Sequence, residues 1–327
     1  MLGLGIESTA HTFSCAIIEK RGKKGKILSD IKKIYRPESG EGIHPREASR
    51  HHIEHSSSVL SECLKEAKVS IKDLDIVSYA AGPGLGPCLR VGAVVARSLA
   101  SFYKIPIYPV NHAIGHIELG KLLTGASNPL VLLVSGGHTM LLAFLDKQWR
   151  VFGETLDITL GQLLDQFGRS IGFASPCGKN IEELASTSSN YVTLPYSVKG
   201  NDVSFSGLLS ATKSVAKKSK IDACYSLQET AFAMISESVE RALSFTNKKE
   251  LMIVGGVAAN KRLSEMLKDV CKRHGCKFFV VPLRFAGDCG SQICWTGILE
   301  SQVKQGTLLK DTFVTQSWRL DSVKIDY

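Results

Sequence analysis

The chain has 327 residues, of which 44% are hydrophobic and 22% are charged, as is typical of a folded globular protein with about two domains. The first residues lead straight into a strand-like stretch without a basic and then apolar segment, and no apolar run approaches the ~18 residues that cross a bilayer, so we expect a soluble, cytoplasmic protein without a membrane partner. The formal net charge of +9 favours an anionic partner such as nucleic acid, with merely solvated lysines as the alternative.

Two strand-turn-strand patterns of one design lie more than a hundred residues apart. The first covers Gly3 to Ile18 with a small polar turn at Glu7 to Thr12, and the second covers Leu130 to Phe144 with the turn Ser135 to Thr139. Such repetition indicates a duplicated lobe.

Each pattern precedes a β-α-β unit. The first unit has strands at 76–81 and 105–110 around a helix at 91–103, and the second has strands at 251–254 and 278–281 around a helix at about 259–274. We therefore predict an α/β protein of two lobes with a central cleft, residues 1–126 and 127–327.

Two histidines follow the strand that ends at Val110. On a helix His112 and His116 share one inward stripe, and paired histidines one turn apart have the geometry of metal ligands. Hydrogen-bonded core histidines are the alternative. Asp288, which we expect just after a strand, is a plausible anionic third ligand.

A rival histidine pair occurs in the pattern H-x-x-E-H, formed by His51, Glu54 and His55. This is the inverted zinc-protease motif. On a helix Ile53 and Leu60 would lie on the packing side, opposite the two histidines. We interpret the pair as a solvated face or the rim of a cleft rather than a protease centre.

Glycine and small polar residues in both hairpin turns provide backbone N–H groups suited to phosphate, above all at Gly136 and Gly137. The loop from Gly82 to Pro87 is glycine-rich too, but its prolines lack donors, so we interpret it as structural. Asp157, Gly161 and Asp165 would align on successive helical turns and leave a bare spot between two carboxylates, which are either solvated or part of a cleft.

The nine cysteines form no C-x-x-C pair, and we expect reduced structural thiols rather than zinc ligands. Lysine and arginine gather in two clusters that could guide an anionic partner towards the cleft: Lys20, Arg21, Lys23, Lys24 and Lys26, and Lys213, Lys217, Lys218 and Lys220.

Several motifs in a fixed order together resemble one family. They are Gly5 to Thr12, His44 to Ala48, Gly82 to Val91, Val110 to Glu118, Ser135 to Gly137, Gly153 to Asp157, Phe205 to Leu208 and Gly255 to Asn260. The chain resembles the tRNA threonylcarbamoyladenosine transferases of the archaeal and eukaryotic type, the catalytic subunit of the KEOPS complex, once described as glycoprotein endopeptidases.

The resemblance implies the actin-like ATPase fold of sugar kinases, Hsp70 and actin, with two ribonuclease H-like lobes. It implies transfer of a threonylcarbamoyl group from its mixed anhydride with AMP to N6 of the adenosine beside the anticodon in tRNAs that read ANN codons. The implied partners are tRNA, a small kinase-like protein, a small dimerising subunit and an accessory subunit.

The resemblance also implies two sets of site residues. The implied metal ligands are His112, His116 and Asp288, with Fe2+ as the usual ion and zinc or magnesium as alternatives. The implied contacts of the adenine nucleotide, threonylcarbamoyl-AMP or ATP, are Leu133, Val134, Ser135, Gly136, Gly137, Asp165, Gly178, Glu182 and Asn260.

The chain departs from the family pattern at Leu133, where the family commonly has a tyrosine that contacts the metal, and around Gly178, where a glycine pair and a proline are usual. Two other classes of function stay open at this point. They are a metal-dependent endopeptidase and a non-catalytic ATP-binding scaffold.

Overall fold

The computed structural model describes residues 1–38 and 41–327, which fall into two compact units. Unit 1 comprises Met1–Arg36, Ile43–Leu123 and Asp288–Tyr327, and unit 2 comprises Pro37–Gly42 and Thr124–Gly287. The two-part division of the sequence, 1–126 and 127–327, differs from this mainly because residues 288–327 return to unit 1, and also because Pro37–Gly42 belongs to unit 2. In the described residues, no helix has the length and apolar character that a membrane span requires.

Unit 1 is built on a sheet of five strands with helices on both faces. Its elements are β1 (Leu2–Glu7), β2 (Thr12–Arg21), β3 (Lys24–Ile34), α1 (Pro45–Ala67), β4 (Ile76–Gly82), α2 (Gly86–Tyr103), β5 (Ile107–Asn111), α3 (His112–Thr124) and α10 (Gly290–Glu300). The strand order is β3-β2-β1-β4-β5; β2 is antiparallel to β1 and β3, and β4 is parallel to β1 and β5.

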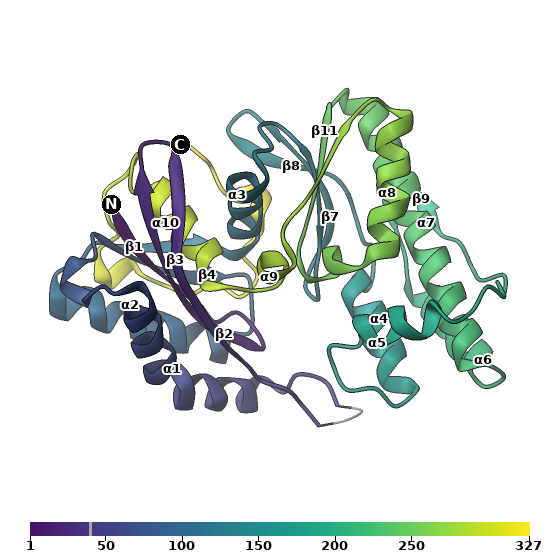
Figure 1. Cartoon of the computed structure of the whole chain (residues 1–327), viewed down its shortest axis with the longest axis horizontal. Coiled ribbons are helices and arrows are strands. Elements are labelled where there is room, and N and C mark those ends of the chain that lie inside the picture. Colours follow the sequence, from purple (N-terminus) through teal and green to yellow (C-terminus); the bar gives the residue numbers. More distant parts are fainter. Residues whose placement is uncertain (39–40) are drawn as a thin grey trace. The chain divides into compact units, whose positions relative to one another are not determined.

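Alternating side chains of this sheet pack in two directions. Leu4, Ile6 and Tyr79 belong to a core with residues of α1 and α2, whereas Ile18 and Ile76 pack with residues of α10. This alternation is the period-two pattern of a strand with both faces covered. Figure 1 shows α1 and α2 together beside the sheet.

Unit 2 repeats the design. Its principal elements are β6 (Leu130–Val134), β7 (Thr139–Leu145), β8 (Gln148–Glu154), α4 (Leu160–Ser170), α5 (Gly178–Ala185), α6 (Ser206–Ala216), α7 (Lys220–Thr246), β11 (Glu250–Val254), α8 (Lys261–Arg273), β12 (Lys277–Val280) and α9 (Leu283–Ala286). Two short strands, β9 (Val198–Lys199) and β10 (Asp202–Val203), form a separate hairpin.

The larger sheet of unit 2 has the order β12-β11-β6-β7-β8. In reverse, β8-β7-β6-β11-β12 matches the order of unit 1 strand for strand, with the same antiparallel and parallel pairs. The duplicated lobe predicted from the two hairpin patterns is therefore confirmed.

Helix α10 packs so closely on the unit 1 sheet that two glycines are required. A Cβ on Gly5 would lie 2.2 Å from the backbone nitrogen of Cys294, and one on Gly290 would lie 2.5 Å from that of Ala16. This close packing is the physical reason that the last part of the chain belongs to unit 1. The prediction kept residues 288–327 in the second lobe, because the sequence pattern gives no sign that this segment packs on the first sheet.

Candidate metal and nucleotide sites

Helix α3 begins directly at the carboxyl end of β5 and carries the predicted histidine pair. The side-chain oxygen of Asn111 accepts hydrogen bonds from the backbone nitrogens of Ala113 at 3.0 Å and Ile114 at 3.2 Å. It therefore satisfies backbone donors at the start of the helix. His112 and His116 are 5% and 2% exposed, so the predicted inward direction of both imidazoles is confirmed.

Asp288 lies against both imidazoles. Its Oδ1 is 3.5 Å from Nε2 of His112 and 3.4 Å from Nε2 of His116. Within the described residues, these three are the one group of histidine, cysteine and carboxylate side chains with metal-ligand spacing, and their ligand atoms lie within 4.8 Å of one another. The expectation that Asp288 follows a strand directly was wrong, since α9 intervenes and Asp288 precedes α10.

A carboxylate from β1 fixes the orientation of His112. Oε2 of Glu7 lies 2.8 Å from Nδ1 of His112, and Oε1 accepts hydrogen bonds from the backbone nitrogen and the hydroxyl of Thr9 at 2.6 and 2.5 Å. The amide nitrogen of Gln292 on α10 lies 3.0 Å from the same Nδ1. With Nδ1 turned to Glu7, Nε2 of His112 is the ring nitrogen that faces Asp288.

The charges of the group are strongly coupled. Burial lowers the pKa of His112, but the Glu7 carboxylate outweighs it and, with Asp288, raises that pKa to about 9. Burial lowers the pKa of His116. Burial also raises the pKa of Asp288, yet its interactions with His116 and His112 hold that pKa well below the usual range. A cation bound by these side chains would therefore meet an ionised carboxylate and would displace a proton from His112.

The donor set suits a transition-metal ion. The buried Nε2 of His116 has no hydrogen-bond partner among the described residues, as expected of an atom reserved for a ligand. Ligand atoms about 2.1 Å from a transition-metal ion are roughly 3.0 Å apart in octahedral and roughly 3.4 Å apart in tetrahedral geometry, and the two distances to Asp288 are close to the upper value. Two histidines and one carboxylate that leave coordination positions open are typical of non-haem Fe(II) sites.

The rival histidine pair, His51 and His55, lies on α1. The neighbouring His52 is the histidine of this helix that is fully buried, and its Nε2 lies 3.0 Å from the carbonyl oxygen of Ala10. Leu60 packs against the core as expected, but Ile53, expected on the same side, is 62% exposed, so the assignment was wrong for Ile53. His51 and His55 lie with ring centroids 4.4 Å apart, half-buried and without a third ligand in the described chain.

The predicted phosphate turn of unit 2 follows β6. Leu133 and Val134 are buried strand residues, and the hydroxyl of Ser135 accepts hydrogen bonds from the backbone nitrogens of Gly137 at 3.2 Å and His138 at 3.1 Å. Gly136 and Gly137 are exposed, with open space where a Cβ would stand. The turn therefore presents backbone without a covering side chain.

Four other predicted nucleotide contacts meet in pairs. Asp165 on α4 accepts a hydrogen bond at 2.7 Å from the backbone nitrogen of Cys177, next to Gly178 at the start of α5. Glu182 on α5 accepts one at 2.7 Å from the backbone nitrogen of Lys261.

Asn260 directly precedes Lys261 and caps α8 by accepting a hydrogen bond from the backbone nitrogen of Leu263 at 3.1 Å. Glu182 and Asn260 therefore meet at the start of α8. Because β6 and β11 are parallel neighbours, the Ser135 turn and the segment that leads from β11 to Asn260 leave the same edge of the sheet, where α/β proteins bind ligands.

Three other predicted features are structural. Asp157 precedes α4 instead of aligning with Asp165 on it, and its carboxylate accepts hydrogen bonds from the backbone nitrogens of Phe205 at 2.8 Å and Ser206 at 2.9 Å. These bonds and that of Ser204 outweigh burial and lower the pKa of Asp157.

The first hairpin turn is engaged as well, since Thr9 donates its backbone N–H to Glu7 and accepts one from Leu85 with its carbonyl. The predicted structural role of the Gly82 to Pro87 loop is confirmed, because the backbone nitrogen of Gly84 donates to the carbonyl oxygen of Gln316.

In the described chain the cysteines take no part in the metal-ligand group, and one basic cluster lies away from it. All nine cysteines are free, and in the described chain none belongs to a group with metal-ligand spacing. Glu7 pairs with Ser14 at one end of β1, and Leu2 pairs with Glu19 at the other. The cluster from Lys20 to Lys26 therefore lies about one strand length, roughly 17 Å at ~3.4 Å per residue, from Glu7. The expectation that this cluster guides an anionic partner towards the cleft stays a prediction.

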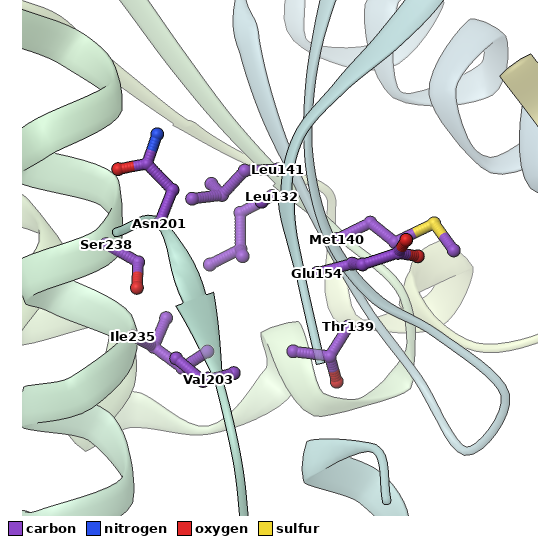
Figure 2. Close-up of a pocket in the computed structure, with 10 residues that line it drawn as sticks. Leu132, Thr139, Met140, Leu141, Glu154, Asn201, Val203, Ile235 and Ser238 are labelled. Atoms are coloured by element: carbon purple, nitrogen blue, oxygen red, sulfur yellow. The ribbon is translucent and has the colours of Figure 1, made fainter. Parts of the chain in front are cut away.

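Unit 2 contains a small cavity that is lined by none of the predicted nucleotide contacts, although some of its lining residues belong to the same sheet. Its volume is about 10 Å³, and Thr139, Asn201 and Ser238 are among its lining residues. Figure 2 shows the side chains of Asn201 and Ser238 on one side of it and that of Thr139 at the N-terminal end of β7. The volume suits a single water molecule, which could bond the unpaired hydroxyl of Ser238, and excludes a nucleobase.

Sequence reasoning missed two groups that surround His112. Glu7 lies in a motif that was noted for its turn, and its contact with a histidine 105 residues away has no local signal. Gln292 lies on a helix that the sequence pattern did not predict. Both contacts arise because β1 and α10 pack beside the start of α3.

Fold and site together define a protein of two ribonuclease H-like lobes, the actin-like ATPase fold, with a His-His-Asp group in unit 1. The structure is similar to HypF of T. kodakarensis, with a TM-score of 0.66 and 13% identity over 92% of this chain and 47% of that one. It is similar to the activator of 2-hydroxyisocaproyl-CoA dehydratase from Clostridium difficile, with a TM-score of 0.52 and 11% identity over 94% and 100%. These similarities confirm the predicted fold.

The family follows from the sequence comparison. The model of the tRNA N6-adenosine threonylcarbamoyltransferase family matches residues 26–295, and the chain belongs to this family. A protein of that name from Pyrobaculum islandicum is 45% identical over 100% of this chain and 98% of its own length.

A longer relative comes from Methanothermobacter thermautotrophicus and is named a probable bifunctional tRNA threonylcarbamoyladenosine biosynthesis protein. It is 46% identical over 100% of this chain but only 61% of its own length. This chain thus spans about three fifths of the bifunctional relatives that it matches.

Proposed function

We propose that the chain transfers a threonylcarbamoyl group from threonylcarbamoyl-AMP to N6 of the adenosine adjacent to the anticodon in tRNA. In this reaction the amine attacks the carbamoyl carbon, a C–N bond forms, the C–O bond to AMP breaks, and AMP and a proton are released. The observation that carries the proposal is the His112, His116 and Asp288 group in a member of this family. The names of the relatives supply the tRNA and the transferred group.

The ion that fits best is Fe2+, because two histidines and one carboxylate are its typical facial ligands; zinc and magnesium are alternatives. Bound there, a divalent cation supplies a Lewis acid for the carbonyl of the transferred group. Glu7 keeps the imidazole of His112 oriented through Nδ1. Asp288 supplies the negative charge that such a cation requires.

Unit 2 is proposed to hold the AMP part of the donor. Gly136 and Gly137 offer exposed backbone at the strand edge, which suits phosphate. Glu182 and Asn260 at the start of α8 are proposed to contact the ribose and adenine. Carboxylates accept hydrogen bonds from hydroxyls and repel phosphate, so the two groups of residues divide the ligand.

The endopeptidase alternative lacks a general base. Such chemistry requires a carboxylate beside the metal-bound water. Glu7 is completely buried and its oxygens already face His112 and Thr9. The ATP-binding scaffold alternative would gain support from an incomplete metal site, but all three ligands have the required spacing despite Leu133.

The proposed partners are those of the KEOPS complex: a small kinase-like protein, a small dimerising subunit and an accessory subunit, together with tRNA. The basis is the family resemblance and the net charge of +9, which favours an anionic partner. The cytoplasm stays the predicted location.

The test is nucleoside analysis of tRNA after incubation with the chain, its partners, threonine, bicarbonate, ATP and the synthase that makes the anhydride. Wild-type protein should produce threonylcarbamoyladenosine, and His116→Ala should produce none, whereas the matched variant His55→Ala should act as wild type. The proposal is wrong if wild type yields no modified nucleoside under conditions in which a bona fide family member does.

A further inference from the structure

We propose that Asp30 is a positioning residue for the metal ligand Asp288, and that it acts through the start of helix α10. The inference rests on the proposed metal role of Asp288. Asp30 lies on β3 and belongs to none of the motifs that identify the family. It is 9% exposed, and its carboxylate is directed at the first turn of α10.

Two side chains from neighbouring strands satisfy the first backbone donors of α10. Oδ2 of Asp30 accepts a hydrogen bond at 3.0 Å from the backbone nitrogen of Ser291 and another from the Ser291 hydroxyl. The hydroxyl of Ser14 accepts one at 2.9 Å from the backbone nitrogen of Gly290 and lies 3.2 Å from Oδ1 of Asp30. Strands β2 and β3 therefore hold the helix by its end.

The arrangement is physically costly unless all of its bonds form. Burial raises the pKa of Asp30, and the hydrogen bonds from Ser291 and Ser14 offset this only in part. A negative charge at a helix N-terminus is favourable because the free N–H groups there carry partial positive charge. Without Asp30 the Ser291 N–H would be buried and unsatisfied, and the first turn would gain by moving towards water.

The position of this first turn decides the geometry of the site. Asp288 stands two residues before the helix and reaches His112 and His116, while Gln292 on the first turn reaches Nδ1 of His112. Both residues therefore depend on where the helix begins. A shift of the turn would separate the Asp288 oxygen from the imidazoles even though every ligand is still present.

A rival explanation is that packing alone holds α10. Gly5 and Gly290 bring the helix backbone directly onto the sheet, and Ser78 donates a hydrogen bond at 3.0 Å to the carbonyl oxygen of Ile293. If these contacts suffice, loss of Asp30 would lower stability without any effect on the metal ligands. Ser78→Ala is thus a matched control, because it removes a buried bond to a carbonyl of the same helix and none to the N–H groups at its start.

The experiment measures Fe2+ affinity under anaerobic conditions, by competition with a chromophoric chelator, for wild type, Asp30→Ala, Asp30→Asn and Ser78→Ala. Amide hydrogen exchange at Gly290 and Ser291 and thermal unfolding are recorded alongside. Asp30→Ala should raise the Kd for Fe2+ about tenfold, as supporting groups around metal ligands commonly do, and should speed exchange at both amides.

Asp30→Asn keeps one acceptor for Ser291 and should lie between Asp30→Ala and wild type, which also preserves the test if the alanine variant does not fold. Ser78→Ala should lower the Tm but leave the Kd within about twofold. The inference is overturned if Asp30→Ala and Asp30→Asn lower the Tm and leave the Kd unchanged. If wild type itself binds no Fe2+, the proposed metal role fails first, which is a different and recognisable result.

Discussion

Nδ1 of His112 and Oε2 of Glu7 are 2.8 Å apart, which joins the end of β1 to the first residue of α3 across 105 positions of the chain. Carboxylates that bond the second nitrogen of a metal-binding histidine fix its orientation and raise its basicity. Glu7 is completely buried, so this relationship is part of the core of unit 1 as well as of the site.

Replacing the carboxylate of Glu7 should therefore weaken metal binding without removing a ligand. Glu7→Gln keeps the shape of the side chain but removes the charge that raises the pKa of His112 to about 9. We expect the Kd for Fe2+ to rise by about 10- to 100-fold in chelator competition. Glu19→Gln, at the opposite end of the same strand pair, is the control and should bind as wild type; equal affinities in both variants would contradict the role of Glu7.

Removal of either imidazole should abolish metal binding altogether. His112→Ala and His116→Ala each leave two of the three ligands, and we expect no stoichiometric metal by elemental analysis, with an unchanged circular dichroism spectrum. His51→Ala serves as the comparison because it alters the rival histidine pair. Metal that persists in both ligand variants and disappears from His51→Ala would show that the wrong pair was chosen.

The nucleotide assignment makes a separate prediction at Glu182. If its carboxylate accepts hydrogen bonds from the ribose, Glu182→Ala should weaken the binding of AMP and of adenosine alike. The Kd of each, measured by calorimetric titration, should rise by a factor of about ten. The adjacent Glu183→Ala is a suitable control, since Glu183 is exposed and pairs with Lys179. A loss confined to ligands that bear phosphate would contradict the assignment to ribose.

The two basic clusters should now differ in their effect on tRNA. Lys213, Lys217 and Lys218 are exposed at the end of α6 and just beyond it. Converting these three to glutamine should reduce the salt slope of tRNA binding by roughly 2 to 3, at about 0.7 to 0.9 per lost phosphate contact. AMP affinity should not change.

The same conversion of Lys20, Lys23 and Lys24 should leave tRNA binding almost as it is, because the β2–β3 turn lies far from Glu7 along the sheet. Binding titrations at several salt concentrations, with and without partner subunits, measure both variants. If the Lys20, Lys23 and Lys24 variant changes the salt slope of tRNA binding and the Lys213, Lys217 and Lys218 variant does not, the geometric argument is wrong.

His52 should make the stability of the chain depend on pH. Burial lowers its pKa from 6.5 to about 4, and the neighbouring His51 adds to the effect. The unfolded chain therefore takes up a proton between pH 6.5 and 4 that the folded chain refuses. The contribution of neutral His52 to the free energy of unfolding is fully present above pH 6.5 and is lost as the pH drops towards 4. The free energy of unfolding should fall by about 2 kcal/mol between pH 7.5 and 5.

Urea unfolding at these two pH values measures this effect. His52→Gln cannot titrate, so the difference in unfolding free energy between pH 7.5 and 5 should shrink by that amount relative to wild type. His274→Gln is a control, because His274 lies in unit 2 and pairs with Glu240. An equal pH dependence in wild type and His52→Gln would contradict the predicted neutral state of the buried imidazole.

Much of the fold could be predicted from local patterns. The two hairpins and two β-α-β units appear in the structure within a few residues of their expected ends, because hydrophobic alternation and turn residues act over short distances. One local prediction failed on α1, where Ile53 is exposed and His52 is buried. There the backbone carbonyl of Ala10, which is not visible in the pattern of the helix, provides the partner that allows a histidine to be buried.

By itself the sequence determined the duplicated α/β design, the inward histidine pair on α3 and the family to which the chain belongs. Only the tertiary structure decided that residues 288–327 return to unit 1, that Glu7 orients His112, and that Asp30 meets the first turn of α10. The physical reason is that periodicity records which face of an element is buried but not which distant element covers it. Contacts across 105 or 261 positions depend on how helices and sheet pack once they have formed.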